Sequence, residues 1–211
     1  KIHFTILFLE NKMRKLFPLF LLIFISAPFF SQEVDYIGIP ELSFGETKLV
    51  LAASSQKSKI LYVQDYIPED SRLEDSPYTI SIYFFNKNID AKEATYQKTS
   101  ELDTRQGTDK FCTYHVTENP NGTEFIVDFF TSNIAKKKEK DEPEPEQEMA
   151  DYNIYRFRNI LLGDQTAFMI ITYKQKNTGD TKYFIKSVGK SRNKLMENII
   201  TMTIPNVTLK K

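Results

Sequence analysis

Apolar and polar side chains alternate along several short stretches of the chain, which is the pattern of strands with one buried face. The clearest case is residues 78–85, in which every second side chain from Tyr78 to Phe84 is apolar and the other face is half polar. Seven stretches are predicted as strands, namely residues 48–53, 59–66, 78–85, 111–117, 123–132, 152–161 and 166–174. The pattern therefore predicts a fold built mainly from sheet.

Turn residues separate these stretches. Asn121 and Gly122 supply the positive backbone angles that a tight hairpin needs, so the two strands that flank them are predicted to pair. Residues 34–45 contain Pro40 and Gly45, which are typical of loops. This stretch is predicted as an irregular entry segment.

Two stretches change to the period of a helix. Asp90 and Glu93 stand in the relation of a helix N-cap and its partner, and they predict a helix that reaches Gln106. After Asp180, which could cap the second helix, a stripe recurs every three or four residues: Phe184, Val188, Ser191, Leu195, Ile199 and Met202. Gly189 is expected to divide this second helix into two short ones.

These elements predict an α+β protein, in which an antiparallel β-sheet of about six to seven strands packs with two main helices. With a strand at residues 78–85, a helix directly after it and a closing helix, the chain resembles PsbP-like α+β domains over residues 48–202. It also resembles small secreted bacterial proteins whose signal ends in Ser-Gln and whose roles are not established. Members of such folds mostly serve as accessory or binding proteins, and the resemblance implies a role of that kind.

An apolar stretch near the start has the pattern of a secretory signal peptide. Met13, Arg14 and Lys15 precede a short apolar run that ends in small residues. A spanning helix needs about 20 apolar residues, and this run is shorter. We expect residues 1–31 to be removed, leaving residues 32–211 as a single exported domain, periplasmic or extracellular, with no stable membrane span.

Two segments are expected to lie outside the folded core. Residues 1–12 either precede the true start or belong to a long signal. Residues 135–150 are almost entirely Lys, Glu, Asp, Gln and Pro, so apolar burial cannot offset the entropy lost on ordering them. We expect a disordered insertion between two paired strands, because a longer loop adds little to the cost of closure.

Composition and charge narrow the classes of function. Hydrophobic residues make up 41% of the chain, which is enough for a core. The chain has no net charge, and loss of the basic leader leaves the remainder with about three negative charges. This balance argues against nucleic-acid binding and against adhesion to an anionic membrane. We therefore expect the partner to be an envelope protein or a small ligand.

Few side chains are of the kinds that carry out nucleophilic catalysis or hold metals. Cys112 is the sole cysteine, and His115 is the sole histidine after the leader. Residues three apart on a strand point to opposite faces, so a Cys-His dyad is not expected and Cys112 is predicted to be buried. A structural zinc site needs about four such ligands, and the sequence holds no glycine-rich phosphate loop. The sequence assigns no catalytic residue, metal site or cofactor.

Acidic and aromatic residues leave alternatives open. Asp128 lies among apolar residues and is either a poised acid or the partner of an arginine such as Arg156 or Arg158. Residues 70–75 and 141–148 lack the ligand spacing of an EF-hand loop and are interpreted as solvated charge. Five tyrosines either line a binding face or pack on the sheet: Tyr62, Tyr66, Tyr83, Tyr114 and Tyr155.

Three hypotheses about function follow. The first is a non-enzymatic binding or accessory factor of the cell envelope. The second is a carboxylate-based hydrolase that uses Asp128 and a second acid. The third is an assembly subunit that presents the charged loop 135–150 to a partner.

Overall fold

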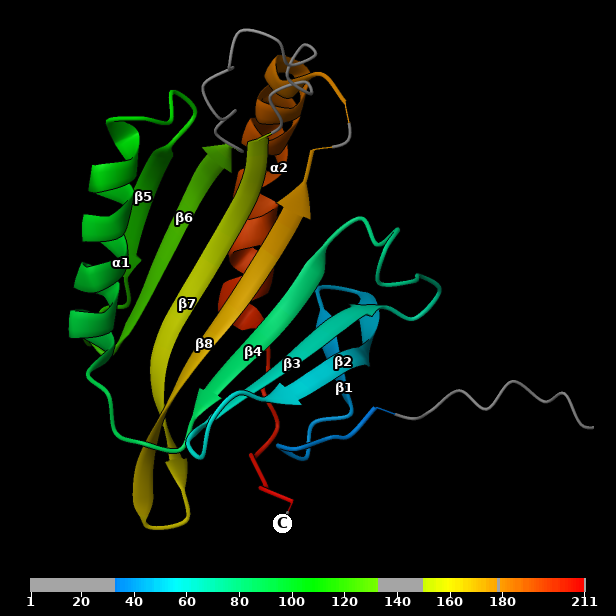
Figure 1. Ribbon diagram of the computed structural model, residues 1–211, viewed down its shortest axis with the longest axis vertical. Coiled ribbons are helices and arrows are strands. Elements are labelled where there is room, and N and C mark those ends of the chain that lie inside the picture. Colours follow the sequence, from blue (N-terminus) through cyan, green and yellow to red (C-terminus); the bar gives the residue numbers. More distant parts are fainter. Residues whose placement is uncertain (1–32, 133–149, 178, 211) are drawn as a thin grey trace, which may run out of the picture. The chain divides into compact units, whose positions relative to one another are not determined.

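The computed structural model describes residues 33–132, 150–177 and 179–210, and these residues form one antiparallel sheet with two helices (Figure 1). The sheet has the order β1-β2-β3-β4-β8-β7-β6-β5. The strands are β1 (Glu41–Phe44), β2 (Thr47–Gln56), β3 (Leu61–Pro68), β4 (Thr79–Phe85), β5 (Thr113–Glu118), β6 (Glu124–Ser132), β7 (Ala150–Leu162) and β8 (Gln165–Lys176). The helices are α1 (Ala91–Gln106) and α2 (Thr181–Thr201).

The predicted α+β class is confirmed, but the predicted number of strands is too low, because the described residues form eight. The missing strand is β1, which lies inside the segment predicted to be irregular. The expected signal and residues 135–149 of the expected insertion lie outside the described residues. Ala150, predicted as the end of that insertion, is instead the first residue of β7 and is buried.

The two helices cover opposite faces of the sheet. In β6, Ile126 belongs to the apolar cluster that includes the buried side chains of α2, whereas its neighbour Val127 belongs to the cluster under α1. Adjacent residues of a strand point to opposite faces, so the two clusters lie on the two sides of the sheet. Figure 1 shows α1 at the β5 side of the sheet and α2 behind β7 and β8, and α1 contacts β5, β6 and β7. The predicted alternation therefore produces two cores.

Both predicted N-caps are present. The Asp90 carboxylate accepts a hydrogen bond from the Glu93 N–H at 2.9 Å, and that of Asp180 accepts one from the Tyr183 N–H at 2.7 Å. Each bond satisfies a main-chain donor that the first turn of a helix cannot pair internally. The prediction of a break at Gly189 is wrong, because α2 runs unbroken through that residue.

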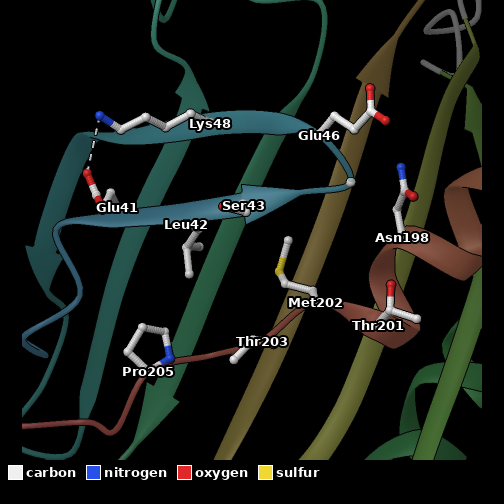
Figure 2. Close-up of a pocket in the computed structure, with 11 residues that line it drawn as sticks. Glu41, Leu42, Ser43, Glu46, Lys48, Asn198, Thr201, Met202, Thr203 and Pro205 are labelled. Carbon is white, nitrogen blue, oxygen red and sulfur yellow. Dashed lines mark ion pairs between the residues drawn. The ribbon is translucent and has the colours of Figure 1, made fainter.

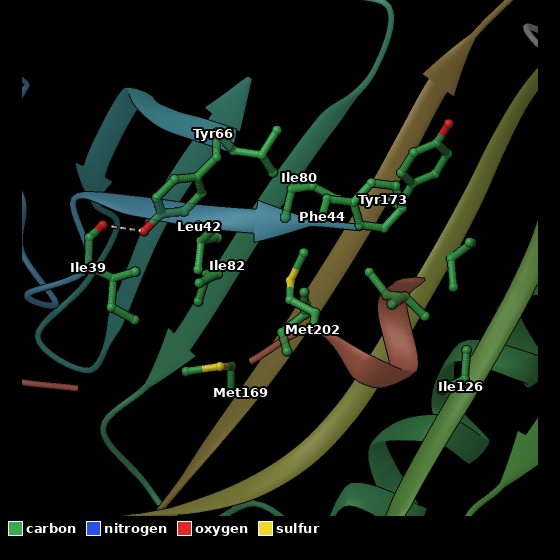
Figure 3. Packing of buried hydrophobic residues seen from close by; sticks show 14 of the residues in the cluster. Ile39, Leu42, Phe44, Tyr66, Ile80, Ile82, Ile126, Met169, Tyr173 and Met202 are labelled. Carbon is green, nitrogen blue, oxygen red and sulfur yellow. Dashed lines mark hydrogen bonds between the residues drawn. The ribbon is translucent and has the colours of Figure 1, made fainter. Parts of the chain in front are cut away.

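The larger core lies under α2 and reaches the edge of the sheet. Leu42 and Phe44 of β1 belong to the same cluster as Tyr173 and Met202 (Figure 3). The rings of Phe44 and Tyr173 stack with their centroids 5.4 Å apart. A strand of four residues can form few main-chain bonds, so this side-chain burial is what holds β1 in place.

A carboxylate joins the end of β6 to the segment after α1. Asp109 is buried and accepts hydrogen bonds from the Ser132 N–H at 2.7 Å, the Ser132 hydroxyl at 2.6 Å and the Phe111 N–H at 3.0 Å. Arg105 adds an ion pair at 2.9 Å. Burial alone would raise the pKa of Asp109, but these bonds stabilise the anion and hold the pKa below its usual value.

The lowered pKa of Asp109 predicts a loss of stability in acid. Its contribution is complete above the unfolded pKa of 3.8 and disappears as the pH falls through the lower folded value. Between about pH 5 and pH 2, Asp109→Asn should therefore lose less of its free energy of unfolding than the unchanged protein. Urea unfolding at several pH values measures the difference, and parallel curves for the two proteins would contradict the prediction.

Candidate functional site

Strand β1 is placed by a buried hydrogen-bond network just before it. The Gln64 side chain, which is fully buried, accepts from the Ile37 N–H at 3.0 Å and donates to the Ile39 carbonyl at 3.3 Å. The Tyr66 hydroxyl donates to the same carbonyl at 2.8 Å. These bonds fasten residues 37–39 to β3, so the chain enters β1 from a fixed position.

The outer edge of β1 carries free main-chain groups. β1 pairs with β2, and the N–H of Leu51 donates to the carbonyl of Pro40 at 3.1 Å. In an antiparallel pair the bonded residues alternate, so the main-chain groups of Leu42 and Phe44 also face β2. The N–H and C=O groups of Glu41 and Ser43 therefore point away from the sheet.

After α2 the chain returns along the segment that precedes β1. The N–H groups of Thr208 and Lys210 donate to the carbonyls of Ile37 and Tyr36 at 2.9 and 3.1 Å. Within the part of the chain that the structure describes, no main-chain bond joins residues 203–205 to β1. The returning chain therefore pairs with the entry segment but leaves the edge of β1 open.

A hollow of about 640 Å³ lies between β1 and the end of α2, and we call it the β1 groove (Figure 2). Leu42 and Met202, which are 4% and 5% exposed, form its apolar floor. Its full lining is Glu41, Leu42, Ser43, Gly45, Glu46, Lys48, Asn198, Thr201, Met202, Thr203 and Pro205. Polar side chains around an apolar floor are typical of a binding site rather than of a core defect.

The turn between β1 and β2 closes one end of this groove. Gly45 has a φ of +59° and begins the two-residue turn, as hairpins of this length require. A Cβ at this position would come within 2.8 Å of the Asn198 side chain on α2. Gly45 thus allows the hairpin to approach α2 closely. A second hollow of about 640 Å³ lies beyond this contact and includes Tyr78 and Ser191.

The rim of the β1 groove carries more negative than positive charge. Lys48 contacts Glu41 at 3.4 Å and Glu69 at 3.1 Å, and the hydrogen bonds to these carboxylates, first Glu69 and then Glu41, raise its pKa. Glu46 adds a carboxylate at the turn. Because one ammonium is shared by two carboxylates, the groove favours a ligand with a positive group.

A second candidate site, which we call the sheet hollow, lies on the α1 face where α1 does not cover β3, β4 and β8. It has a volume of about 290 Å³ and is lined by Asp65, Leu73, Thr79, Ser81, Tyr83, Asn153, Tyr155, Thr172, Lys174 and Lys176. Lys174 forms an ion pair with Asp151 at 2.9 Å. The sheet hollow therefore offers the hydroxyl groups of Thr79, Ser81, Tyr83, Tyr155 and Thr172 beside the charges of Asp65 and Lys176, which suits a small polar ligand.

The two tyrosines of the sheet hollow are poor proton donors. Burial raises the pKa of Tyr155 to about 12, and it also raises the pKa of Tyr83. The Lys98 ammonium of α1 lies 5.0 Å from the centre of the Tyr155 ring and pairs with Glu101 at 3.0 Å. Both hydroxyls therefore stay protonated near neutral pH and act as neutral hydrogen-bonding groups.

The five tyrosines named from the sequence do not form one face. Tyr83 and Tyr155 line the sheet hollow, whereas Tyr66 is buried in the α2 core. Tyr62 packs against that same core, and the Tyr114 hydroxyl donates to Asp103 at 2.6 Å. The alternative of one tyrosine binding face is wrong.

Asp128 is buried, and both of its oxygens are engaged. Arg192 of α2 donates to them from Nε at 2.7 Å and from Nη2 at 2.6 Å, and the Tyr152 hydroxyl donates at 3.1 Å. The bond to Asp128 raises the pKa of Arg192. The arginine partner foreseen for Asp128 exists, but it is neither Arg156 nor Arg158.

Arg156 instead holds the C-terminal end of α2. Its Nη1 donates to the Ile199 carbonyl at 2.9 Å, and its guanidinium pairs with Glu124 at 2.6 Å. Arg158 contacts the same Glu124 at 3.4 Å. A guanidinium at the end of a helix satisfies carbonyls that have no partner within the helix.

Cys112 and His115 do not meet in a catalytic arrangement. Cys112 is buried beside Leu102, and burial raises the pKa of its thiol, whereas His115 is exposed on β5. The predicted burial of Cys112 is confirmed. A protonated, buried thiol is a weak nucleophile.

The acidic stretches show no metal arrangement where they can be seen. Among the described residues, no three Asp, Glu, His or Cys side chains come together as a metal site requires. Residues 70–75 lie in the connection between β3 and β4, whereas residues 141–148 lie outside the described residues. No described helix has the length and apolar character needed to cross a membrane.

A protein-family model matches residues 37–204. The chain belongs to this family. The match covers the segment from the entry to β1 through the end of α2, so it includes the whole sheet hollow and every residue of the β1 groove except Pro205. No curated protein and no solved structure matched the chain.

The hydrogen bonds of Asp128 with Arg192 and Tyr152 predict that this carboxylate stabilises the fold. Asp128→Asn leaves Arg192 without its anion, and we expect the free energy of unfolding to fall by about 2–4 kcal/mol. Replacing both residues together, with Asp128→Leu and Arg192→Met, should cost less than the sum of the two single changes. Urea denaturation of Asp128→Asn, of the two single variants Asp128→Leu and Arg192→Met, and of the double variant measures these losses, and strictly additive losses in the double variant would contradict the coupling.

Proposed function

We propose that the protein is an exported, non-enzymatic binding or accessory factor of the cell envelope, and that the β1 groove is its binding site. The observation that carries the proposal is the open edge of β1 inside this groove. Unpaired main-chain groups of Glu41 and Ser43 beside the apolar floor of Leu42 and Met202 provide hydrogen bonds and apolar contact to a ligand.

The state of the candidate catalytic groups supports a binding role. The Asp128 carboxylate is held by Arg192 and Tyr152, and the Cys112 thiol is buried. None of the described residues that line the β1 groove is a histidine or a cysteine. The chemistry of the groove is therefore that of hydrogen bonding and charge pairing, which suits recognition.

The proposed export is tested by determining where the protein is found in the cells that produce it naturally and whether its leader has been removed. Because residues 13–31 have the pattern of a signal peptide, we expect a shortened protein beginning at Gln32 in the envelope or the medium. Cell fractionation and N-terminal sequencing measure both properties. An uncleaved protein found mainly in the cytosol would overturn the export.

The non-enzymatic part is tested with a broad panel of glycans and esters. We expect no turnover above that of a buffer control, because Asp128 is committed to Arg192. If turnover is found, Asp128→Asn and Arg192→Met distinguish loss of a catalytic carboxylate from loss of the ion pair. Both variants break the ion pair, but only the first removes the carboxylate. Activity lost in the first variant and kept in the second would establish the hydrolase instead.

A further inference from the structure

We propose that the β1 groove binds an extended peptide segment of a partner protein, which adds to the free edge of β1 as an additional strand. This inference rests on the proposed binding function and names the occupant of its site. An extended segment presents the alternating N–H and C=O groups that Glu41 and Ser43 leave unpaired. The ligand is therefore recognised first by its main chain.

The side chains of the groove define the sequence that the segment needs. A peptide residue opposite Leu42 shares its face of the sheet and lies over the apolar floor with Met202. Its two neighbours share the other face with Glu41 and Ser43, where carboxylates outnumber ammonium groups. The expected motif is an apolar residue between two basic ones.

A second copy of the chain fits this groove poorly. The segment from Met202 to Pro205 bounds the groove opposite β1, so the edge of a second folded sheet would meet this segment as it approached β1. Pairing of two β1 edges would also bring Glu41 and Glu46 of one copy close to those of the other. Short edge strands with charged residues are a common protection against such pairing.

A displayed peptide library with three random positions between threonines tests the motif. The full chain should enrich sequences of the form basic–apolar–basic. The peptide acetyl-Thr-Lys-Val-Lys-Thr-amide should then bind more tightly than acetyl-Thr-Glu-Val-Glu-Thr-amide, as measured by fluorescence anisotropy of labelled versions. Recovery of no sequence, or of acidic sequences, would overturn the inference.

Ser43→Pro tests the main-chain pairing. Proline removes the N–H that faces the groove and leaves the bonds of Leu42 and Phe44 to β2 in place, and edge strands tolerate it. Binding of the lysine peptide should weaken at least about tenfold in this variant. Ser43→Ala is the matched control, because it removes the hydroxyl but keeps the N–H, and it should bind the lysine peptide at least about fivefold more tightly than Ser43→Pro does.

Hydrogen exchange provides a readout that does not depend on the proline variant being folded. In the unchanged protein, the amide protons of Glu41 and Ser43 should exchange several-fold more slowly when the lysine peptide is added. Equal binding by Ser43→Pro and the unchanged protein, or unaltered exchange at both amides, would overturn strand addition. The export and turnover experiments are independent of these results, so strand addition can fail while the broader binding role stands.

Discussion

The position of α2 on the sheet is fixed by two arginine contacts, and both the larger core and the β1 groove depend on it. Arg192 reaches down from the helix to Asp128 in β6, and Arg156 reaches up from β7 to the last carbonyls of the helix. Together they place the end of α2, and with it Met202, against the cluster that contains β1. A shift of α2 along the sheet would break both contacts and close or widen the groove.

We expect the partly buried pair of Asp128 and Arg192 to contribute more to the placement of α2 than to the free energy of unfolding. Removing Asp128 and Arg192 from water costs much of what their attraction returns, so the net gain is small. An unpaired partner, however, is strongly unfavourable, and this disfavours other placements of α2. The apolar side chains of the helix supply the burial, and the arginines select where the burial occurs.

The sequence pattern predicts the parts of the fold that local chemistry determines. Alternation identifies seven of the eight strands, and Asp90 and Asp180 identify the helix starts. The helix does not break at Gly189. A single glycine costs a helix about 1 kcal/mol, and the free energy gained by burying Val188 and Met196 on either side is larger. Local propensity therefore yields to packing at this position.

The candidate site is harder to predict because it depends on contacts between distant residues. Glu41 to Phe44 show the alternation of a strand, but four residues between Pro40 and Gly45 are too few to be separated from a loop. Arg192 is 64 positions from Asp128, whereas Arg156 and Arg158 lie closer in the chain, and a reading of neighbouring residues therefore favours them as partners. The period of hydrophobic residues along the chain carries no information about ion pairs between residues this far apart.

The β1 groove and the sheet hollow differ in the polar groups and apolar surface that they leave without a protein partner. This difference favours the β1 groove as the binding site. In the sheet hollow, Lys174 is paired with Asp151, and the hydroxyl groups and the charges of Asp65 and Lys176 can be satisfied by water. In the β1 groove, the main-chain groups of two exposed residues face a space floored by apolar side chains, and water can pair with those groups but leaves the apolar floor in contact with solvent. An extended segment satisfies those groups and covers that floor at the same time, so the groove gains more from an occupant than the sheet hollow does.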